Sequence, residues 1–284
     1  MAKVRIITDA TVYLNSDTAD KYQITVLPVE VLFGDETFVL GHNDSPTKLF
    51  SRMITGPADE IRVSISSTGI QEAYRALNAE TDEILVIVSS RALSHIYDTA
   101  LAEAQSFLGR CRIVVADSES TSWGLGLVVE AAAQAAEAGQ SLDQIVRLVR
   151  GVLPHIYLVL IIDRLDYLEK GRRIGPAQAL LGSLLRIKPL LIVEDGEIIP
   201  MEKVRTQAMA TDKLVEFVSE FAAVDQVVIL CSPLGHDGSP LADELRERLT
   251  EALPGYEFPA IEYDPVLASH VGPEAVGVIV YEKF

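Results

Sequence analysis

Cysteine is nearly absent from this chain of 284 residues, which contains only Cys111 and Cys231. The two lie far apart in the sequence, and neither belongs to a CxxC pair of the kind that binds metal or exchanges disulfides. We therefore expect two reduced thiols in a cytoplasmic protein, and we predict no metal site.

Long apolar runs are also missing. No segment approaches the roughly 18 to 20 continuous apolar residues that a membrane span requires. The first β-rich run, residues 4–8, is far too short for the core of a signal peptide. The sequence predicts a soluble, cytoplasmic protein without stable membrane insertion.

Positive charge is scarce, since 24 Lys and Arg stand against 41 Asp and Glu, for a formal net charge of -17. Such a field repels nucleic acids and anionic bilayers at long range, so no nucleic-acid partner is expected. Residues 170–188 are an exception, with five basic residues and no acid. A solvated face is the ordinary interpretation of this basic segment, and a site for phosphate or carboxylate is the alternative.

Familiar catalytic motifs are absent as well. The sequence has no GxxxxGK[ST], GxSxG or HExxH pattern. Gly124 and Gly126 follow a predicted strand, but Val129 stands where a dinucleotide fingerprint needs its third glycine, so helix packing explains these glycines better. The pattern favours a protein without a cofactor and gives no support to catalysis by a known motif.

The residues that are present predict an α/β fold. Length alone suggests two domains. In the first half, β-branched runs alternate with helical patterns, which indicates a parallel sheet with crossover helices. The expected strands are residues 4–8, 24–33, 84–89 and 112–116, and the expected helices are residues 46–54, 69–79, 96–108 and 122–138. We predict an N-terminal three-layer domain over residues 1–153.

A helix from Ser141 that breaks at Pro154 marks the expected domain boundary near residue 153. Residues 154–284 are predicted to form a C-terminal domain with a mixed sheet and helices. Asp195-Gly196, between two apolar runs, is a strong hairpin signal. The expected strands are residues 156–162, 188–193, 198–200, 226–231, 258–263 and 276–282, and the expected helices are 165–169, 176–184, 206–222 and 239–252.

Polar residues just after the strands are the candidates for a site, because ligands collect at the carboxyl ends of strands in such sheets. Ser94 lies between a predicted strand and a helix, so its hydroxyl either caps that helix or binds an anion at the helix N-terminus. The hydroxyl cluster with Ser64 and Ser67 admits the same two interpretations. His270 lies beside a Gly-Pro turn before a strand, where a loop histidine either is solvated or donates to a carboxylate.

The order of these segments resembles the DegV family of bacterial fatty-acid-binding proteins almost from end to end. The matching motifs are ITD at residues 7–9 with VLPV at 26–29, the serine-containing loop 90–97, DS at 117–118, LDYLEKGRRI at 165–174, LGSLLRIKP at 181–189 with DG at 195–196, KVRT at 203–206 and HVGP at 270–273. Single motifs are ambiguous, but the ordered set is specific.

The resemblance implies two domains that clasp a long-chain fatty acid, with the acyl chain in an internal apolar tunnel and the carboxylate at the domain junction. It also implies a carrier rather than an enzyme, which presents the acid to a separate fatty acid kinase in phospholipid metabolism. Ser94 and His270 match the residues near the carboxylate, and Ser64 and Ser67 align with the hydroxyls that complete the head-group site. The N-terminal domain would then carry the head-group loops, and the C-terminal domain the basic segment and part of the acyl cavity.

Two arginines, Arg173 and Arg205, match family residues on the face offered to the kinase. Several positions depart from the family pattern, namely Ala10, Val63, His95, Ile96, Arg172, Gly175 and Glu274. Val63 removes a threonine hydroxyl, and His95 could donate to the carboxylate in its place or could plug part of the cavity. These changes affect kinase docking more than lipid binding.

Two other classes of function stay open. A serine hydrolase or acyltransferase would use Ser94 with His270 or His95 as the base, although no third group that could orient the base is evident. A regulatory protein could retain the fold without the cavity and bind no lipid. In each case we expect a monomer or a weak dimer.

Overall fold

The computed structural model describes residues 3–41, 46–56, 61–163, 166–170, 187–233 and 239–283. Two compact units make up the chain. The first unit consists of Met1–Ser45 with Arg62–Pro154, and the second of Pro46–Ile61 with His155–Phe284. Both units combine helices with β-sheet, so the chain has the predicted α/β class.

A four-stranded parallel sheet forms the centre of the first unit, as predicted. Its strands are β1 (Arg5–Asp9), β2 (Thr25–Leu27), β6 (Glu83–Val88) and β7 (Arg112–Asp117), in the order β2-β1-β6-β7. In β6 the five residues 84–88 are all inaccessible to solvent, as expected for a strand with both faces covered.

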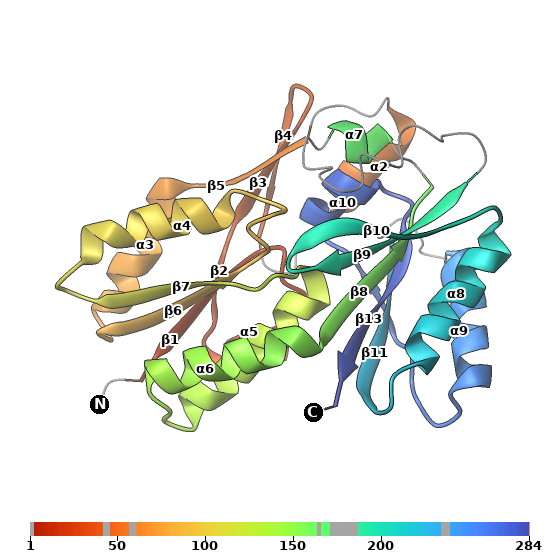
Figure 1. Cartoon of the computed structure of the whole chain (residues 1–284). Coiled ribbons are helices and arrows are strands. Elements are labelled where there is room, and N and C mark those ends of the chain that lie inside the picture. The colour runs from red at the N-terminus through yellow and green to blue at the C-terminus, as the bar shows by residue number, and fades with distance from the viewer. Residues whose placement is uncertain are drawn as a thin grey trace. The chain divides into compact units, whose positions relative to one another are not determined.

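Helices cover both faces of this sheet and make the unit three-layered (Figure 1). One face carries α3 (Ser67–Asn78) and α4 (Ile96–Ala104), which continues into the short 3-10 turn η1 (Gln105–Phe107). The other face carries α5 (Ser122–Glu137) and α6 (Leu142–Val152). The short helix α1 (Ser16–Tyr22) packs against α5.

A second, small sheet also belongs mainly to the first unit. It consists of β3 (Val29–Phe33), β4 (Glu36–Leu40) and β5 (Ile61–Ile65), in the order β4-β3-β5. The sequence predicted one strand over residues 24–33, but the chain divides at Pro28 into β2 and β3. Proline has no N–H to donate to a strand ladder, which explains the break. Strand β4 was not predicted, because its polar and apolar residues do not alternate along the sequence. In the structure, only Leu40 of this strand is buried.

The second unit contains a six-stranded mixed sheet, as predicted. Its strands are β8 (Ile156–Ile161), β9 (Lys188–Glu194), β10 (Glu197–Val204), β11 (Val224–Cys231), β12 (Ala260–Glu262) and β13 (Val276–Glu282), in the order β10-β9-β8-β13-β11-β12. Among the strand pairs that the described residues form in this sheet, only β11 and β12 are parallel. The hairpin between β9 and β10 turns at Asp195 and Gly196, with φ angles of 50° and 79°, and so confirms the Asp-Gly signal.

Helices α8 (Gln207–Ser219) and α9 (Pro240–Ala252) pack on one face of the mixed sheet. Their apolar side chains join those of β8, β11 and β13 in one core, which includes Val159, Leu214, Ile229, Leu245 and Val278. The unit also holds α2 (Thr47–Thr55), α7 (Asp166–Lys170) and α10 (Pro265–Val271). The helix expected over residues 176–184 lies outside the described residues.

The segment Pro46–Ile61 departs from the predicted division into residues 1–153 and 154–284, because it packs with the second unit. Leu49, Phe50 and Met53 of α2 are all buried. The Phe50 ring meets Tyr263 edge-on at 5.3 Å, and the Tyr167 hydroxyl donates to the Met53 carbonyl oxygen at 2.9 Å. These partners lie more than a hundred residues away in the sequence, so local patterns could not reveal them.

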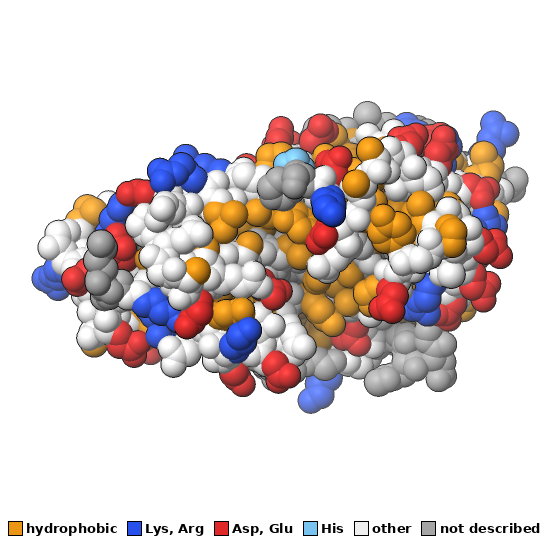
Figure 2. All heavy atoms as spheres, turned by 90° about the horizontal axis from the view of Figure 1, so that it is seen from below, with side chains coloured by type: hydrophobic (Ala, Val, Ile, Leu, Met, Phe, Trp, Pro, Cys, Tyr) orange, Lys and Arg blue, Asp and Glu red, His pale blue; other side chains and the backbone are white. Residues whose placement is uncertain are grey.

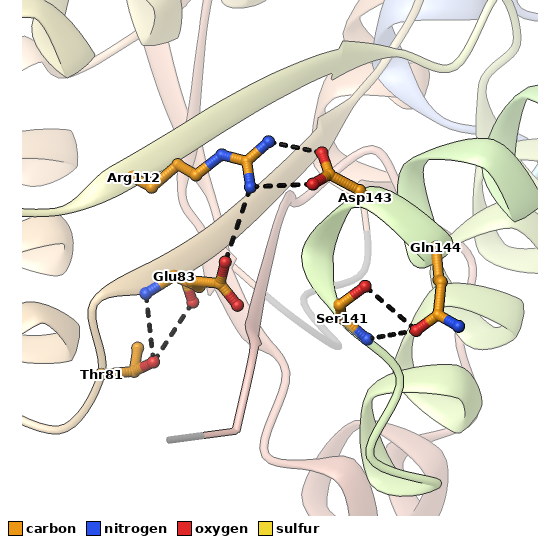
Figure 3. A network of polar contacts seen from close by, with 6 residues as sticks. All are labelled: Thr81, Glu83, Arg112, Ser141, Asp143 and Gln144. Atoms are coloured by element: carbon orange, nitrogen blue, oxygen red, sulfur yellow. Dashed lines mark hydrogen bonds and ion pairs between the residues drawn. The ribbon is translucent and has the colours of Figure 1, made fainter. Parts of the chain in front are cut away.

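A polar network at the amino end of the parallel sheet ties α6 to two strands (Figure 3). Arg112, at the start of β7, forms an ion pair with both oxygens of Asp143 in α6 and lies 3.6 Å from Glu83 of β6. Beside it, Ser141 and Gln144 form a capping box at the start of α6. The ion pairs are largely exposed, so they contribute little to the stability of the fold.

Basic side chains on the surface are interspersed with acidic ones on the face shown in Figure 2. Some of the described basic residues form ion pairs, for example Arg248 of α9 with Asp212 of α8 and with Glu244. No helix within the described ranges is both long and apolar enough to cross a bilayer.

Candidate functional site

The chain order reverses between β1 and β6 in the parallel sheet of the first unit. From β1 the chain proceeds to β2 on one side, and it later returns to β6 on the other side of β1. In open α/β sheets, ligands bind outside the carboxyl ends of the strands at such a switch point. The loops that follow β1 and β6 are therefore where a site is expected, and both carry buried polar side chains.

Ser94 lies in the loop after β6 and is almost completely buried, with 3% of its surface exposed. Its Oγ lies 3.3 Å from the Oγ of Ser89, and it accepts a long hydrogen bond of 3.4 Å from the N–H of Ile96. Its own N–H donates to the Ser90 carbonyl oxygen. The hydroxyl thus contacts the first turn of α4, but it also remains close to the end of β6, so both predicted roles stay compatible with its position.

A buried carboxylate, Asp9, links the two loops at the switch point. One of its oxygens accepts the N–H of Thr11 at 2.9 Å, and the other accepts the N–H of Ser89 at 2.8 Å. Burial raises the pKa of Asp9 above its ordinary value, while the hydrogen bonds from Thr11 and Ser89 act in the opposite direction. Asp9 therefore fixes the start of the serine loop relative to the loop after β1.

The loop after β7 closes over the same region. The carbonyl oxygen of Ser120 accepts the N–H of Ser90, and that of Ser122 accepts the N–H of Tyr13. Ser122 has a φ of 54°, a left-handed conformation that costs energy in a residue with a side chain, and its buried hydroxyl has no hydrogen-bond partner. Backbone hydrogen bonds therefore join the three loops of this edge to one another.

The other predicted residues of the first unit are more exposed. His95 lies at the N-cap position of α4, makes no side-chain capping bond there and has an exposed side chain. Ser64 in β5 and Ser67 at the start of α3 are exposed as well. Ser66 provides the cap of α3, since its Oγ accepts the N–H of Gly69 at 3.2 Å.

His270 belongs to the second unit, and its surroundings correct the prediction. The sequence suggested a loop, but His270 lies in the last turn of α10 and is 5% exposed. Asp264 caps this helix by accepting the N–H groups of Val266 and Leu267, and Pro265 occupies the first turn. Asp-Pro before an apolar run is a helix-start signal, so this element could have been found in the sequence.

Of the two predicted kinase-facing arginines, only Arg205 can be placed. It is exposed, directly before Thr206, which caps α8 by accepting the N–H of Met209. Arg173 lies outside the described residues, as do the departures at Arg172 and Gly175.

Comparison with known proteins identifies the family. A family model with the description "Uncharacterised protein, DegV family" matches residues 3–283. This chain belongs to the DegV family. A DegV domain-containing protein of Streptomyces coelicolor is 34% identical over 292 residues and covers 99% of both chains, and one from Staphylococcus aureus is 31% identical over 284 residues, covering 97% of this chain and 96% of its own.

Solved structures of DegV proteins share the fold along the whole chain. A fatty-acid-binding DegV family protein from Thermus thermophilus is 27% identical with a TM-score of 0.84, and covers 99% of this chain and 100% of its own. A DegV family protein from Corynebacterium glutamicum is also 27% identical, with a TM-score of 0.78, and the match covers 100% of this chain and 99% of its own. A fatty-acid-binding member from Streptococcus agalactiae, at 23% identity with a TM-score of 0.87 and full coverage of both chains, shows the fold alone.

Within this DegV chain, the partners of the Ser94 hydroxyl among the described residues are a second serine and a backbone N–H. Neither of these two groups takes a proton from a nucleophile. Among the described residues, no group of three or more His, Cys, Asp or Glu side chains could hold a metal ion. The arrangement is suited to donating hydrogen bonds to an anion.

Proposed function

We propose that this chain binds a long-chain fatty acid. In this proposal Ser94 and His270 donate to its carboxylate, and the acyl chain occupies an internal apolar tunnel. The observation that carries the proposal is the buried Ser94 hydroxyl at the switch point of a DegV-family sheet, whose partners among the described residues are the Ser89 hydroxyl and the Ile96 N–H. Fatty-acid binding by the related protein from Thermus thermophilus supports it.

The energetics favour separate roles for the acyl chain and the head group. Burial of each CH₂ group contributes about 0.8 kcal/mol, so a long acyl chain supplies most of the affinity and a few hydrogen bonds suffice to orient the head group. Aliphatic side chains are plentiful in the second unit, where Leu158, Leu160 and Ile279 lie on the sheet face opposite to the core with α8 and α9. No cofactor takes part in this role.

Denaturing mass spectrometry of the purified protein is the direct test, and a co-purified fatty acid is the expected result. Ser94→Ala should weaken fatty-acid binding roughly 10- to 100-fold, because a hydrogen bond to a charged group contributes about 1.5 to 3 kcal/mol. His270→Gln should have a similar effect. Thr81→Val is the matched control, because it removes a buried hydroxyl at the opposite end of β6.

A protein that is empty when purified and takes up no added fatty acid would overturn the proposal and favour a regulatory role on the same fold. Labelling of Ser94 by a serine-directed phosphonate would instead support the hydrolase. Neither result is expected.

The role of His95 is a separate part of the proposal. Its exposed position next to the buried Ser94 suits a donor that replaces the threonine absent at Val63. His95→Gly should then reduce affinity, whereas undiminished binding would remove this role. A changed preference for chain length would indicate that His95 plugs part of the cavity.

The final part of the proposal is that this chain presents its bound fatty acid to a separate fatty acid kinase. The exposed guanidinium of Arg205 is suited to contact an anionic group, and Arg173 would act with it. With a kinase and ATP, Arg205→Gln should lower acyl phosphate formation while fatty-acid binding stays unchanged. Arg75→Gln, an exposed arginine on α3 in the first unit, provides the control.

A further inference from the structure

Tyr263, between β12 and α10, is one of the most deeply buried aromatic residues of the second unit. The residue is 1% exposed, and its ring packs edge-on against Phe50 of α2, with the centroids 5.3 Å apart. Burial raises the pKa of its hydroxyl well above the ordinary value, so this group remains a hydrogen-bond donor throughout the neutral range.

The hydroxyl of Tyr263 spans the turn that follows His270. It donates to the carbonyl oxygen of Gly272 at 2.9 Å and accepts the N–H of Ala275 at 3.1 Å. Gly272 has a φ of 84°, and a Cβ there would lie 3.0 Å from the Tyr167 ring. The Tyr263 hydroxyl and the Tyr167 ring therefore both restrict this turn. A single side chain thus connects the end of α10 to the start of β13.

Helix α10 has only seven residues, and a helix of that length is not stable by itself. Two neighbouring residues hold it at its two ends. Asp264 accepts the first N–H groups of the helix, and Tyr263 holds the Gly272 carbonyl just beyond its last turn, two residues after His270. The Tyr263 hydroxyl therefore fixes the turn two residues beyond His270, at the end of the helix that carries the imidazole.

We propose that Tyr263 is a positioning residue for His270. Through the hydrogen bonds that its hydroxyl forms with Gly272 and Ala275, Tyr263 holds His270 in the orientation that receives the carboxylate. This inference rests on the proposed fatty-acid binding for its functional consequence. Its structural part concerns the imidazole of the free protein and can be tested without a ligand.

The test compares Tyr263→Phe with Tyr74→Phe. Tyr74 is also fully buried, donates to a backbone carbonyl oxygen (Ala100, 3.0 Å) and meets a phenylalanine edge-on (Phe107, 5.6 Å), but it belongs to the first unit. Both variants lose a buried tyrosine hydroxyl. Only Tyr263→Phe should shift the nuclear magnetic resonance signal of the His270 side chain, assigned by its loss in His270→Gln.

Fatty-acid affinity provides the second readout. Tyr263→Phe should weaken binding at least about fivefold, and Tyr74→Phe should leave it unchanged. On the His270→Gln background, Tyr263→Phe should add no further loss, because a positioning residue acts through the residue that it positions. Gly272→Ala, which strains the same turn, should shift the His270 signal as well and gives an independent measurement if Tyr263→Phe folds poorly.

An unshifted His270 signal in a folded Tyr263→Phe variant would overturn the positioning role, and if that variant folds poorly, an unshifted signal in Gly272→Ala would overturn it. Losses of affinity that simply add in the double variant would overturn it as well. The proposed function fails in a different way, through a wild-type protein that takes up no fatty acid. In that event a shifted His270 signal would still support the structural part.

Discussion

At the scale of single residues, the buried carboxylate of Asp9 holds two loops of the first unit together. Each of its two oxygens accepts a backbone N–H from a different loop. The sequence drew attention to this strand end, but not to the bond with Ser89, eighty residues away. Because burial shifts the pKa of this carboxylate, the free energy of unfolding must also depend on pH.

The raised pKa of Asp9 leads to the first prediction. Between the ordinary aspartate pKa and the raised one, the folded protein binds more protons than the unfolded chain, so the Asp9 contribution to the free energy of unfolding falls as the pH rises through this window. Asp9→Asn should remove this pH dependence, whose size is about 1.4 kcal/mol for every pH unit between the folded and unfolded pKa values. Denaturant unfolding of both proteins across the acidic pH range measures it.

Asp143→Asn is the control, with the opposite sign. Its ion pair with Arg112 lowers the pKa of Asp143, so this residue stabilises the fold above the ordinary aspartate pKa, and that contribution disappears as the pH falls through the lowered one. Parallel pH curves for wild type and Asp9→Asn would contradict the prediction.

Gly126 gives the second prediction. A Cβ at this position would overlap the backbone carbonyl of Tyr13, so α5 approaches the loop after β1 too closely for any side chain. Gly126→Ala should lower the free energy of unfolding by about 1 to 3 kcal/mol, as overpacking does. Gly151→Ala, in α6 with open space around it, should instead raise it by about 0.5 to 1 kcal/mol. Equal effects of the two substitutions in denaturant unfolding would refute this account.

At the scale of elements, most helices and strands were predictable because their signals are local. The Asp-Gly hairpin and the apolar run of β6 are examples. Helix α10 was not predicted although Asp264 and Pro265 form a regular helix start, because its seven residues are too few to show a helical period. Its length of seven residues makes it depend strongly on its cap.

Asp264→Ala is the third prediction. It removes an acceptor for two backbone N–H groups and should lower the free energy of unfolding by about 0.5 to 2 kcal/mol. If His270 binds the carboxylate, fatty-acid affinity should fall as well. Asn15→Ala removes the cap of α1 in the first unit and should reduce stability without an effect on affinity. Calorimetric titration that shows both variants weakened alike would contradict the role of α10.

At the scale of the whole molecule, the chain does not divide into two consecutive halves. The residues from Pro46 to Ile61 leave the first unit, and their helix α2 buries Leu49, Phe50 and Met53 within the second. The helix itself was predicted correctly, because its apolar residues follow the helical period. The unit that it joins depends on distant aromatic partners, Tyr167 and Tyr263.

Leu49→Ala provides the fourth prediction. Leu49 is 1% exposed, so its truncation should cost about 2 to 5 kcal/mol. Hydrogen exchange should then accelerate in α7 and α10 of the second unit, and not in β6 or β7 of the first. Ile54→Ala, on the exposed side of the same helix, should change stability by no more than about 0.5 kcal/mol. Faster exchange confined to β6 and β7 would place α2 with the other unit.

The sequence by itself determined the α/β class, the parallel and mixed sheets, most helices and the membership in the DegV family, because periodicity, turn residues and ordered motifs are properties of neighbouring residues. Only the tertiary structure decided that Asp9 joins the loops after β1 and β6, that His270 lies in a capped helix, and that Tyr263 holds the turn behind it. These features depend on contacts between residues distant in the sequence and on burial, and a local pattern encodes neither of them.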